Sequence, residues 1–195
     1  MAFNNKIKLV AYDPLWAKEF ASIRSILFES LKDNILEIEH VGSTSIPNLI
    51  AKPILDIDIV INPTKSQLHS VIKILNQLGY KHVGDQGISG REAFKRTTEK
   101  VPISDINKTW MAHHLYVCQE NSLAFLNHTT LRDYLLQHPN EAADYGVLKT
   151  NLAKKFPHNM EAYVSGKTEF ISSILNKKGF KDSDLRKISK ENKAS

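Results

Sequence analysis

Residues His40–Ile61, HVGSTSIPNLIAKPILDIDIVI, decide the fold of this 195-residue chain. Within this stretch, Asp56 and Asp58 interrupt an otherwise apolar run that ends at Ile61. Because successive side chains of a strand point to opposite faces, the two carboxylates share one face and lie roughly 6.5 Å apart. Burying them unpaired in so apolar a strand would be costly, so another group must compensate their charge. The stretch therefore predicts a central strand that carries an acidic pair.

Two interpretations of the acidic pair follow from the residues around it. In the first, both carboxylates sit at a solvated strand end and bond to nearby backbone or to Lys52. In the second, they hold Mg²⁺, which proteins bind through one or two carboxylates together with substrate phosphates. The upstream turn at Gly42-Ser43, followed by Thr44 and Ser45, offers N–H and hydroxyl donors for phosphate. This turn favours the second interpretation.

The spacing of these residues resembles the signature of the nucleotidyltransferase superfamily. That signature has an apolar residue, Gly-Ser, a short spacer and then Asp-apolar-Asp-apolar, which Gly42, Ser43, Asp56 and Asp58 match in order. The wider chain, over about residues 8–176, resembles the GrpB family within that fold. The resemblance rests on the segments YDPLWAKEF, IEHVGSTSIPNLIAKPILDIDIVI, GISGREAF, HHLYVC, LRDYLLQHPNEAADYGVLKTNLA and EAYVSGKTEFI. It implies an α/β fold with a nucleotidyltransferase-like mixed β-sheet flanked by helices, and a helical C-terminal part from about residue 122.

The resemblance also implies an activity, the Mg²⁺-dependent transfer of a nucleotidyl group from a nucleoside triphosphate to a hydroxyl acceptor. Asp56 and Asp58 would be the metal ligands. The superfamily usually supplies a third carboxylate from a later strand, but the segment HHLYVC contains no acid. We expect His114 in that position, as metal ligand or general base. The family usually has His where this chain has Tyr116. One Mg²⁺ ion is therefore more consistent with the sequence than two.

A second hypothesis explains the missing carboxylate without catalysis. The chain would then be a nucleotide- or phosphate-binding module, or a chaperone-like module, on the same fold. Some relatives fused to dephospho-CoA kinase suggest such a role, although this chain contains no Walker-type glycine-rich loop. Fold alone does not decide between the two hypotheses.

Basic side chains near these motifs are candidates for phosphate binding. Gly42, Ser43 and Thr44 would cradle the phosphates, and positive charge would come from Lys52, Arg91, Lys95, Arg132, Lys149 and Lys167. Arginine suits bidentate phosphate contacts. For Arg91 and Arg132, structural pairing with Asp56, Asp58 or Asp133 explains the residue equally well.

Composition and charge indicate one α/β domain over residues 1–176. A hydrophobic fraction of 42% and a charged fraction of 24% are ordinary for a globular protein. The single cysteine, Cys118, excludes an intramolecular disulfide and fits the cytoplasm. Of the net charge of +5, the segment Lys177–Ser195 carries +4. We expect a basic, flexible tail there, with no membrane span and no favoured nucleic-acid partner, and the sequence leaves the oligomeric state open.

Hydrophobic periodicity and turn residues predict the order of the elements. We expect strands over residues 36–41, 54–61, 80–83, 91–96 and 113–118, and helices over residues 14–32 and 66–78. A single helical turn is expected over residues 45–49, and a long mobile loop or lid over residues 97–109. Residues 122–177 read as helical, with breaks near Pro139 and Pro157.

Overall fold

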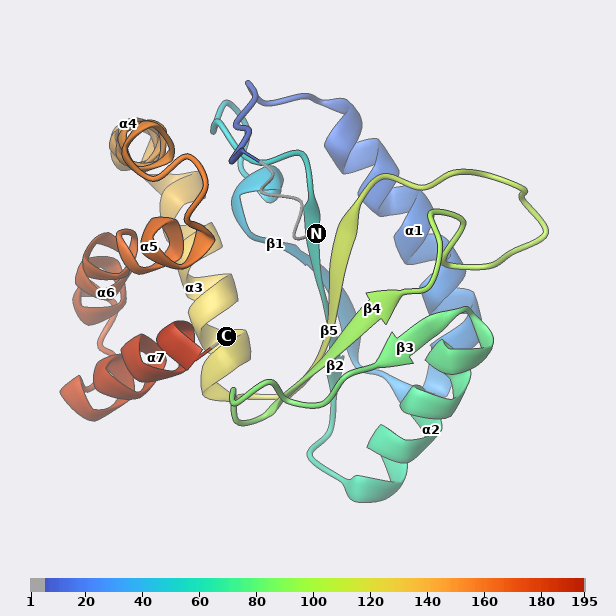
Figure 1. The fold of residues 1–195 in the computed structure, drawn as a ribbon. Coiled ribbons are helices and arrows are strands. Elements are labelled where there is room, and N and C mark those ends of the chain that lie inside the picture. The colour runs from blue at the N-terminus through green and yellow to red at the C-terminus, as the bar shows by residue number, and fades with distance from the viewer. Residues whose placement is uncertain (1–5, 195) are drawn as a thin grey trace.

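A mixed five-stranded sheet forms the centre of the molecule (Figure 1). The computed structural model describes residues 6–194, and of residues 192–194 only the backbone; residues 1–5 and 195 of the expected domain and tail lie outside it. The strand order is β1-β2-β5-β4-β3, with β2 and β5 parallel and the other neighbours antiparallel. The bounds are β1 Glu37–Val41, β2 Leu55–Ile61, β3 Tyr80–His82, β4 Arg91–Arg96 and β5 His113–Gln119. The five predicted strands and the α/β fold class are confirmed.

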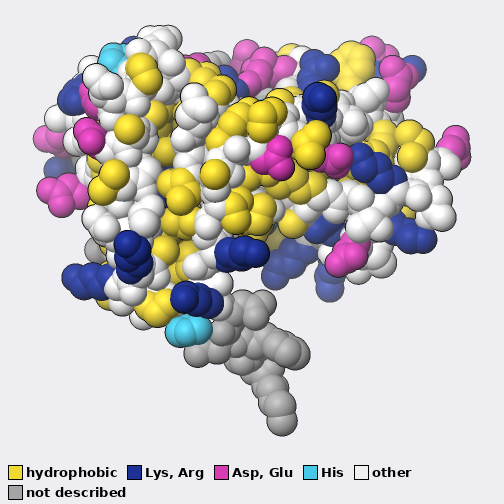
Figure 2. All heavy atoms as spheres, turned by 90° about the horizontal axis from the view of Figure 1, so that it is seen from above, with side chains coloured by type: hydrophobic (Ala, Val, Ile, Leu, Met, Phe, Trp, Pro, Cys, Tyr) yellow, Lys and Arg dark blue, Asp and Glu magenta, His cyan; other side chains and the backbone are white. Residues whose placement is uncertain are grey.

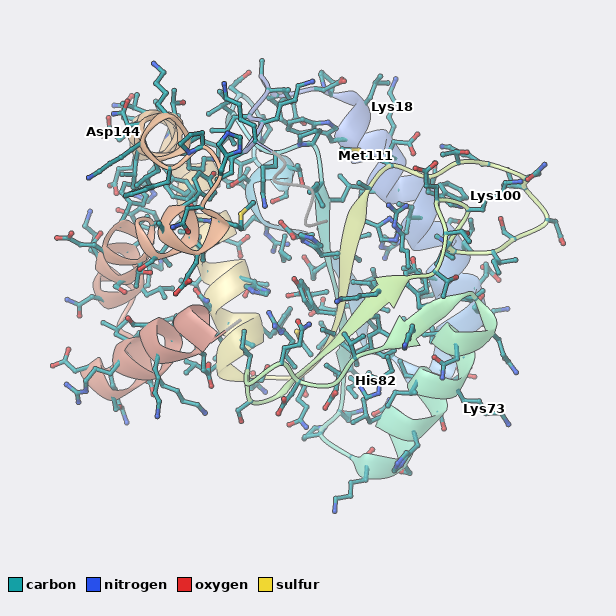
Figure 3. The ribbon with its side chains drawn as sticks, in the orientation of Figure 1. Lys18, Lys73, His82, Lys100, Met111 and Asp144 are labelled. Carbon is teal, nitrogen blue, oxygen red and sulfur yellow. The ribbon has the colours of Figure 1, made fainter. Side chains whose placement is uncertain are left out.

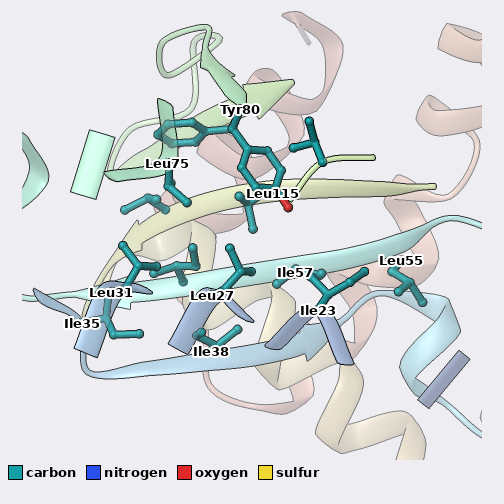
Figure 4. Packing of buried hydrophobic residues seen from close by; sticks show 14 of the residues in the cluster. Ile23, Leu27, Leu31, Ile35, Ile38, Leu55, Ile57, Leu75, Tyr80 and Leu115 are labelled. Atoms are coloured by element: carbon teal, nitrogen blue, oxygen red, sulfur yellow. The ribbon is translucent and has the colours of Figure 1, made fainter. Parts of the chain in front are cut away.

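Two helices cover one face of the sheet. Helix α1, Leu15–Leu31, begins where the Asp13 side chain accepts a hydrogen bond from the Leu15 amide at 2.9 Å. Helix α2, Lys65–Gln77, ends before Gly79, whose φ of +91° suits glycine. Both helices pack against the apolar face of β2, and Figure 4 shows the buried side chains of this core. Burial of this apolar face fixes the acidic pair on the opposite face of β2.

The C-terminal helices lie on that opposite face (Figure 1). Their bounds are α3 Leu123–Gln137, α4 Pro139–Lys155, α5 Met160–Ser165, α6 Thr168–Lys177 and α7 Asp182–Ala194. Helix α3 contacts β1 and β5 directly, and the other helices of this group pack around it. The predicted breaks at Pro139 and Pro157 are confirmed, and a further break at Gly166 separates α5 from α6.

Three local predictions differ from the structure, namely those for the turn after β1, for the loop after β4 and for the C-terminal tail. The expected turn over residues 45–49 lies earlier, as a 3₁₀ turn over Ser43–Ser45, because the Ser45 hydroxyl and amide both bond back to the Gly42 carbonyl. The loop after β4, expected to be mobile, is anchored by buried Val101 and Trp110. The Trp110 indole N–H donates to the Pro102 carbonyl at 3.0 Å, which ties the two arms of the loop together.

The expected flexible tail contains helix α7. Its Ile188 is only 4% exposed and lies with Ile88 at a small cavity beside α3, and Glu191 accepts a hydrogen bond from the Ser89 amide at 3.4 Å. Burial of one isoleucine on an otherwise charged helix was too weak a pattern to predict docking.

Figure 2 shows a face on which hydrophobic side chains are common and Lys and Arg gather along one edge. Within residues 6–194, no helix is long and apolar enough to cross a membrane.

Candidate functional site

The acidic pair of β2 faces α3 and the other C-terminal helices. In the sheet register, Asp56 is opposite Val41 of β1 and His114 of β5, and Asp58 is opposite Glu39 and Tyr116. The Asp56 side chain is 33% exposed, whereas Asp58 is completely buried. The pair therefore has one member open to solvent and one enclosed by the protein.

Each carboxylate is held by a histidine. His114 Nδ1 donates to Asp56 Oδ1 at 2.9 Å, and His128 Nδ1, from α3, donates to Asp58 Oδ2 at 2.8 Å. Burial favours the neutral form of Asp56, but the hydrogen bond from His114 and the nearby positive charges outweigh it and lower the pKa of Asp56. Burial also opposes the charged form of His128, yet the two aspartates raise the pKa of this imidazole. The hydrogen bond from His114 thus favours the charged form of Asp56, and the two aspartates favour the charged form of His128.

Gly42 allows the turn after β1 to pass directly over Asp56. Its φ is +70°, and a Cβ atom at this position would lie 2.9 Å from Asp56 Cγ and would collide with Oδ2. Any larger residue would force either the turn or the carboxylate to move. The glycine of the Gly-Ser motif is thus explained by its contact with the acidic pair.

A cavity of about 210 Å³ opens beside this turn. Its polar end is lined by Gly42, Ser43, Asp56, His128 and Lys167. Its other end is formed by aliphatic side chains of α3, α5, α6 and the segment after the 3₁₀ turn, namely Ile46, Leu131, Leu135, Val164 and Ile171. Pockets for drug-sized ligands are typically about 300–1,000 Å³. The cavity therefore suits part of a nucleotide, such as its phosphates.

Lys167 lines the cavity, Lys149 contacts it only through Ser43, and neither lysine has a carboxylate partner among the described residues. Lys149, only 2% exposed, donates from Nζ to Ser43 Oγ at 2.9 Å and to the Ile50 carbonyl. Burial and the nearby charge of Lys167 lower the pKa of Lys149 to about 7. Burial and Lys52 lower the pKa of Lys167 to about 8, although Asp56 partly opposes this. Anions that enter the cavity would therefore meet lysines that gain from a negative partner.

Several predicted phosphate contacts have structural partners instead. Arg132 binds Glu39 and Asp133 and donates to the His40 carbonyl, so structural pairing is the better interpretation, although its side chain also reaches the cavity wall. Thr44 is buried, and its hydroxyl bonds to His40 Nε2 at 3.0 Å rather than facing the cavity.

The remaining predicted basic residues do not line the cavity. Lys149 acts on it only through Ser43, as described above. Lys52 is partly exposed, and its Nζ lies 3.8 Å from Met160 Sδ. Arg91 is buried beneath Tyr116, with its guanidinium 4.3 Å from the ring centroid and its Nε without a hydrogen-bond partner. Packing of α7 explains why Arg91 faces away, because Ile188 and Glu191 line the small cavity beside it.

Sequence reasoning missed His128 and Asn127, which both line the cavity from α3. The Asn127 Oδ1 atom is buried without a partner. One pattern could have indicated this helix face: His128, Leu131, Arg132 and Leu135 recur at helical spacing. Which face of α3 meets the sheet depends, however, on packing that the local pattern does not specify.

The donor set fits a divalent cation of the Mg²⁺ type. The second oxygen of Asp58, Oδ1, is buried and has no hydrogen-bond partner. A fully buried carboxylate oxygen without a donor is expensive, and a cation is one way to satisfy it. Within the described part of the chain, no group of three or more His, Cys, Asp or Glu side chains is arranged to hold a metal by itself. The residues thus fit one ion that completes its ligand shell with phosphate oxygens or water.

Sequence comparisons relate this chain to bacterial proteins of one family. The model of the family described as GrpB protein matches residues 6–177. The UPF0157 protein YqkA of Bacillus subtilis is 34% identical over 170 residues, which are 86% of this chain but only 46% of YqkA. The glutamate-rich protein GrpB of Alkalihalophilus pseudofirmus is 30% identical over 88% of this chain and 95% of its own length. This chain thus spans about half of YqkA and nearly all of GrpB.

Solved structures with the same fold fall into two groups. The conserved protein GrpB from Enterococcus faecalis aligns with a TM-score of 0.71 and 32% identity, over 93% of this chain and 99% of that one. The Cid1 poly(U) polymerase aligns with a TM-score of 0.56 and 16% identity, over 83% of this chain and 49% of its own. At this identity the second likeness shows the fold alone, which is that of the nucleotidyltransferases.

Proposed function

The chain belongs to the GrpB protein family, and from this premise we propose that it is a Mg²⁺-dependent nucleotidyltransferase. It would bind a nucleoside triphosphate at the cavity beside Gly42 and transfer the nucleotidyl group to a hydroxyl acceptor. The Cid1 poly(U) polymerase has been solved with MgGTP and with its short product ApU, and the proposal extends nucleotide binding and transfer from Cid1 to this chain.

One observation carries the proposal: acidic and basic groups meet at a single cavity in the arrangement that a metal-bound triphosphate needs. Asp56 lines the cavity, and Asp58, on the same face of β2, has a buried oxygen without a hydrogen-bond partner. Ser43 and Lys167 line the same cavity and are donors for phosphate oxygens. A purely structural ion-pair network would bring the carboxylates and lysines into contact, yet neither Lys149 nor Lys167 pairs with an aspartate among the described residues.

The residues have separable roles in this mechanism. Asp56 and Asp58 would hold one Mg²⁺ ion, which when bound neutralises phosphate charge. The Gly42-Ser43 turn and Lys167 orient the phosphates, and the hydrogen bond from His128 holds Asp58 in place. His114 donates through Nδ1 to Asp56, so its Nε2 atom carries the lone pair and can accept the proton of the attacking hydroxyl. Positioning and charge neutralisation supply most of the rate in such chemistry.

A second function is favoured by one specific observation. The face of β5 that meets the acidic pair presents His114 and Tyr116 and no carboxylate. A site with two carboxylates binds a metal nucleotide more readily than it performs two-metal catalysis. The alternative is therefore a nucleotide- or phosphate-binding module on the same fold, without transfer.

Ligand binding and turnover, measured together, separate these functions. The four nucleoside triphosphates are screened with and without Mg²⁺ for a shift in melting temperature and for pyrophosphate release. The test variant is Asp56→Asn, Asp58→Asn, and the control is Asp144→Asn, an exposed aspartate on α4 far from the acidic pair (Figure 3).

We expect Mg²⁺-dependent stabilisation in the wild type and in the control but not in the double variant. Pyrophosphate release that also requires both aspartates supports the transferase. Binding without release, across a panel of hydroxyl acceptors, supports the module. Equal Mg²⁺-dependent shifts in wild type and double variant would refute both roles for the acidic pair.

A further inference from the structure

Two lysines extend the polar face of the sheet beyond the acidic pair. Strand β4 pairs with β3 so that Lys95 lies directly opposite Lys81. Side chains two residues apart on a strand share a face, so Lys95 lies on the face of Ala93, which is opposite Tyr116 and thus on the Asp58 side of the sheet. Both lysines are exposed. Among residues 6–194, neither has a carboxylate within ion-pair distance.

This arrangement is unfavourable for the free protein. Like charges that face each other across neighbouring strands destabilise a sheet. The nearest acid of these strands, Glu92, lies on the other face and bonds to His82 at 2.6 Å. The lysine pair therefore lacks a partner within the sheet that could offset the repulsion, and an anionic ligand would supply one.

A groove beside Lys95 reaches His114, the histidine that bonds to Asp56. It has a volume of about 390 Å³ and is lined by Lys95, Arg96, Thr98 and His114 and also by the acidic Glu99, while Lys81 lies outside it, across the strand pair from Lys95. Arg96 is held at its edge by hydrogen bonds of 3.3 Å to the carbonyls of Trp110 and Met111. The His114 side chain is 47% exposed and touches both regions, since its Nδ1 binds Asp56 on the cavity side. Its Nε2 atom makes no hydrogen bond to a described residue.

We propose that this groove binds the acceptor, and that the acceptor carries a phosphate group near its hydroxyl. Lys81 and Lys95 bind the phosphate, and the hydroxyl lies at His114 Nε2, between the groove and the nucleotide cavity. The inference rests on the proposed function and adds the chemical class of the second substrate. Sugar phosphates and the 3′ ends of oligonucleotides both have this chemistry.

The transfer step balances with these two substrates alone. The acceptor oxygen forms a bond to the α-phosphorus of the triphosphate, and the bond from that phosphorus to the bridging oxygen of pyrophosphate breaks. His114 Nε2 takes the hydroxyl proton, and pyrophosphate leaves with the electron pair of the broken bond. No oxidant, reductant or further reactant is required.

Charge reversal of the two lysines tests the proposal. Two probes represent the two sources: ribose 5-phosphate, followed by calorimetry, and a fluorescein-labelled 12-nucleotide oligoadenylate, followed by anisotropy. The test variant is Lys81→Glu, Lys95→Glu. The control, Lys18→Glu, Lys73→Glu, makes the same change in net charge on α1 and α2, which cover the other face of the sheet (Figure 3).

We expect at least one probe to bind the wild type and the control equally, and the test variant to lose about tenfold or more in affinity. The variant should keep the Mg²⁺-nucleotide shift in melting temperature, because its substitutions lie outside the nucleotide cavity. Preference for one probe identifies the source of the phosphate.

Two results would overturn the inference: neither probe binds the wild type, or the control loses as much affinity as the test variant. A different result is expected if the proposed function itself is wrong. In that case Mg²⁺-nucleotide gives no shift in the wild type, while the lysine-dependent binding of a probe still establishes the anionic groove.

Discussion

His128 on α3 donates a hydrogen bond of 2.8 Å to Asp58, the completely buried carboxylate of β2. This contact joins the C-terminal helices to the sheet at the point where the acidic pair lies. It also explains how a charged side chain is tolerated in an apolar strand, because the two aspartates raise the pKa of His128. The contact between Asp58 and His128 therefore links the stability of the fold to the chemistry of the site.

Removing His128 should destabilise the protein through an unpaired buried charge. We expect His128→Ala to lower the free energy of unfolding by about 3 kcal/mol, whereas Asp58→Asn, His128→Ala should recover part of this loss. The measurement is urea unfolding of the single and double variants, with His69→Ala, an exposed histidine of α2, as control. If the double variant is as unstable as the sum of its single changes, Asp58 and His128 do not stabilise each other.

The contact between Asp58 and His128 also predicts that the stability of the folded protein depends on pH. His128 has a higher pKa in the folded than in the unfolded protein, so its stabilisation is fully present below about pH 6.5 and is lost as pH rises through the folded pKa. The coupling energy between Asp58 and His128 should thus be larger at pH 6 than at a pH above the folded pKa of His128, which an NMR titration of this imidazole locates. A coupling energy that does not fall across that titration would show that protonation of His128 does not stabilise the pair.

We expect a larger residue at position 42 to be unfavourable for two reasons, the positive φ of Gly42 and its close approach to Asp56. Gly84→Ala is a matched control, because Gly84 has a φ of +79° but no atom within 4 Å of an added Cβ. The control should cost about 1–2 kcal/mol from backbone strain. Gly42→Ala combines backbone strain at φ +70° and ψ −173° with a collision with Asp56, so it should cost more and should abolish Mg²⁺-nucleotide stabilisation. Equal losses of unfolding free energy in the two variants would show that the turn moves away without penalty.

Lys149 should make the ligand-free protein more stable as the pH rises. Its pKa is about 7 in the folded protein against an ordinary 10.5, so between these values the unfolded chain binds one more proton. Lys149 should contribute up to about 1.4 kcal/mol per pH unit to this slope, and Lys149→Met should lose that contribution while keeping the one from Lys167, whose pKa is lowered to about 8. Urea unfolding between pH 7.5 and 9.5 measures it, with Lys154→Met, an exposed lysine of α4, as control. An unchanged slope in Lys149→Met would mean that this lysine stays charged in the folded protein.

Helix α7 should contribute to stability although most of its residues are polar. Ile188→Ala should cost about 2 kcal/mol, because Ile188 is buried beside Ile88, whereas Lys190→Ala on the exposed side should be neutral. Thermal unfolding of the two variants measures this difference. If both variants melt like the wild type, α7 does not pack on the body.

The sequence predicted the sheet and the face of it on which Asp56, Asp58 and His114 lie, but not the other side chains around the cavity, for physical reasons that differ between residues. Asp56, Asp58 and His114 lie on strands, where alternation alone assigns each side chain to a face, and the structure brings Asp56 and His114 into contact. His128 lies on a helix whose docking is set by long-range packing, so no local pattern identified it. The orientation of basic side chains was equally hidden: Lys149 and Arg132 turned inward to Ser43 and Glu39, and Arg91 beneath Tyr116.

The loop after β4 and the C-terminal segment show a second limit of prediction from sequence. Both are rich in polar residues, and a polar composition predicts mobility unless the few apolar residues among them find a partner. Trp110 packs into the core and Ile188 against the body, and each fixes a segment that composition alone would leave free. Such anchors depend on surfaces that other parts of the chain provide.

Direct metal binding tests the central claim, that Asp56 and Asp58 together hold one divalent cation. The measurement is a titration of the nucleotide-free protein with Mn²⁺ as a substitute for Mg²⁺, with the free ion counted by electron paramagnetic resonance. We predict one bound ion per chain in the wild type and in Asp144→Asn, and none in Asp56→Asn, Asp58→Asn. The same number of bound ions in the wild type and the double variant, or no bound ion in the wild type, would contradict the account.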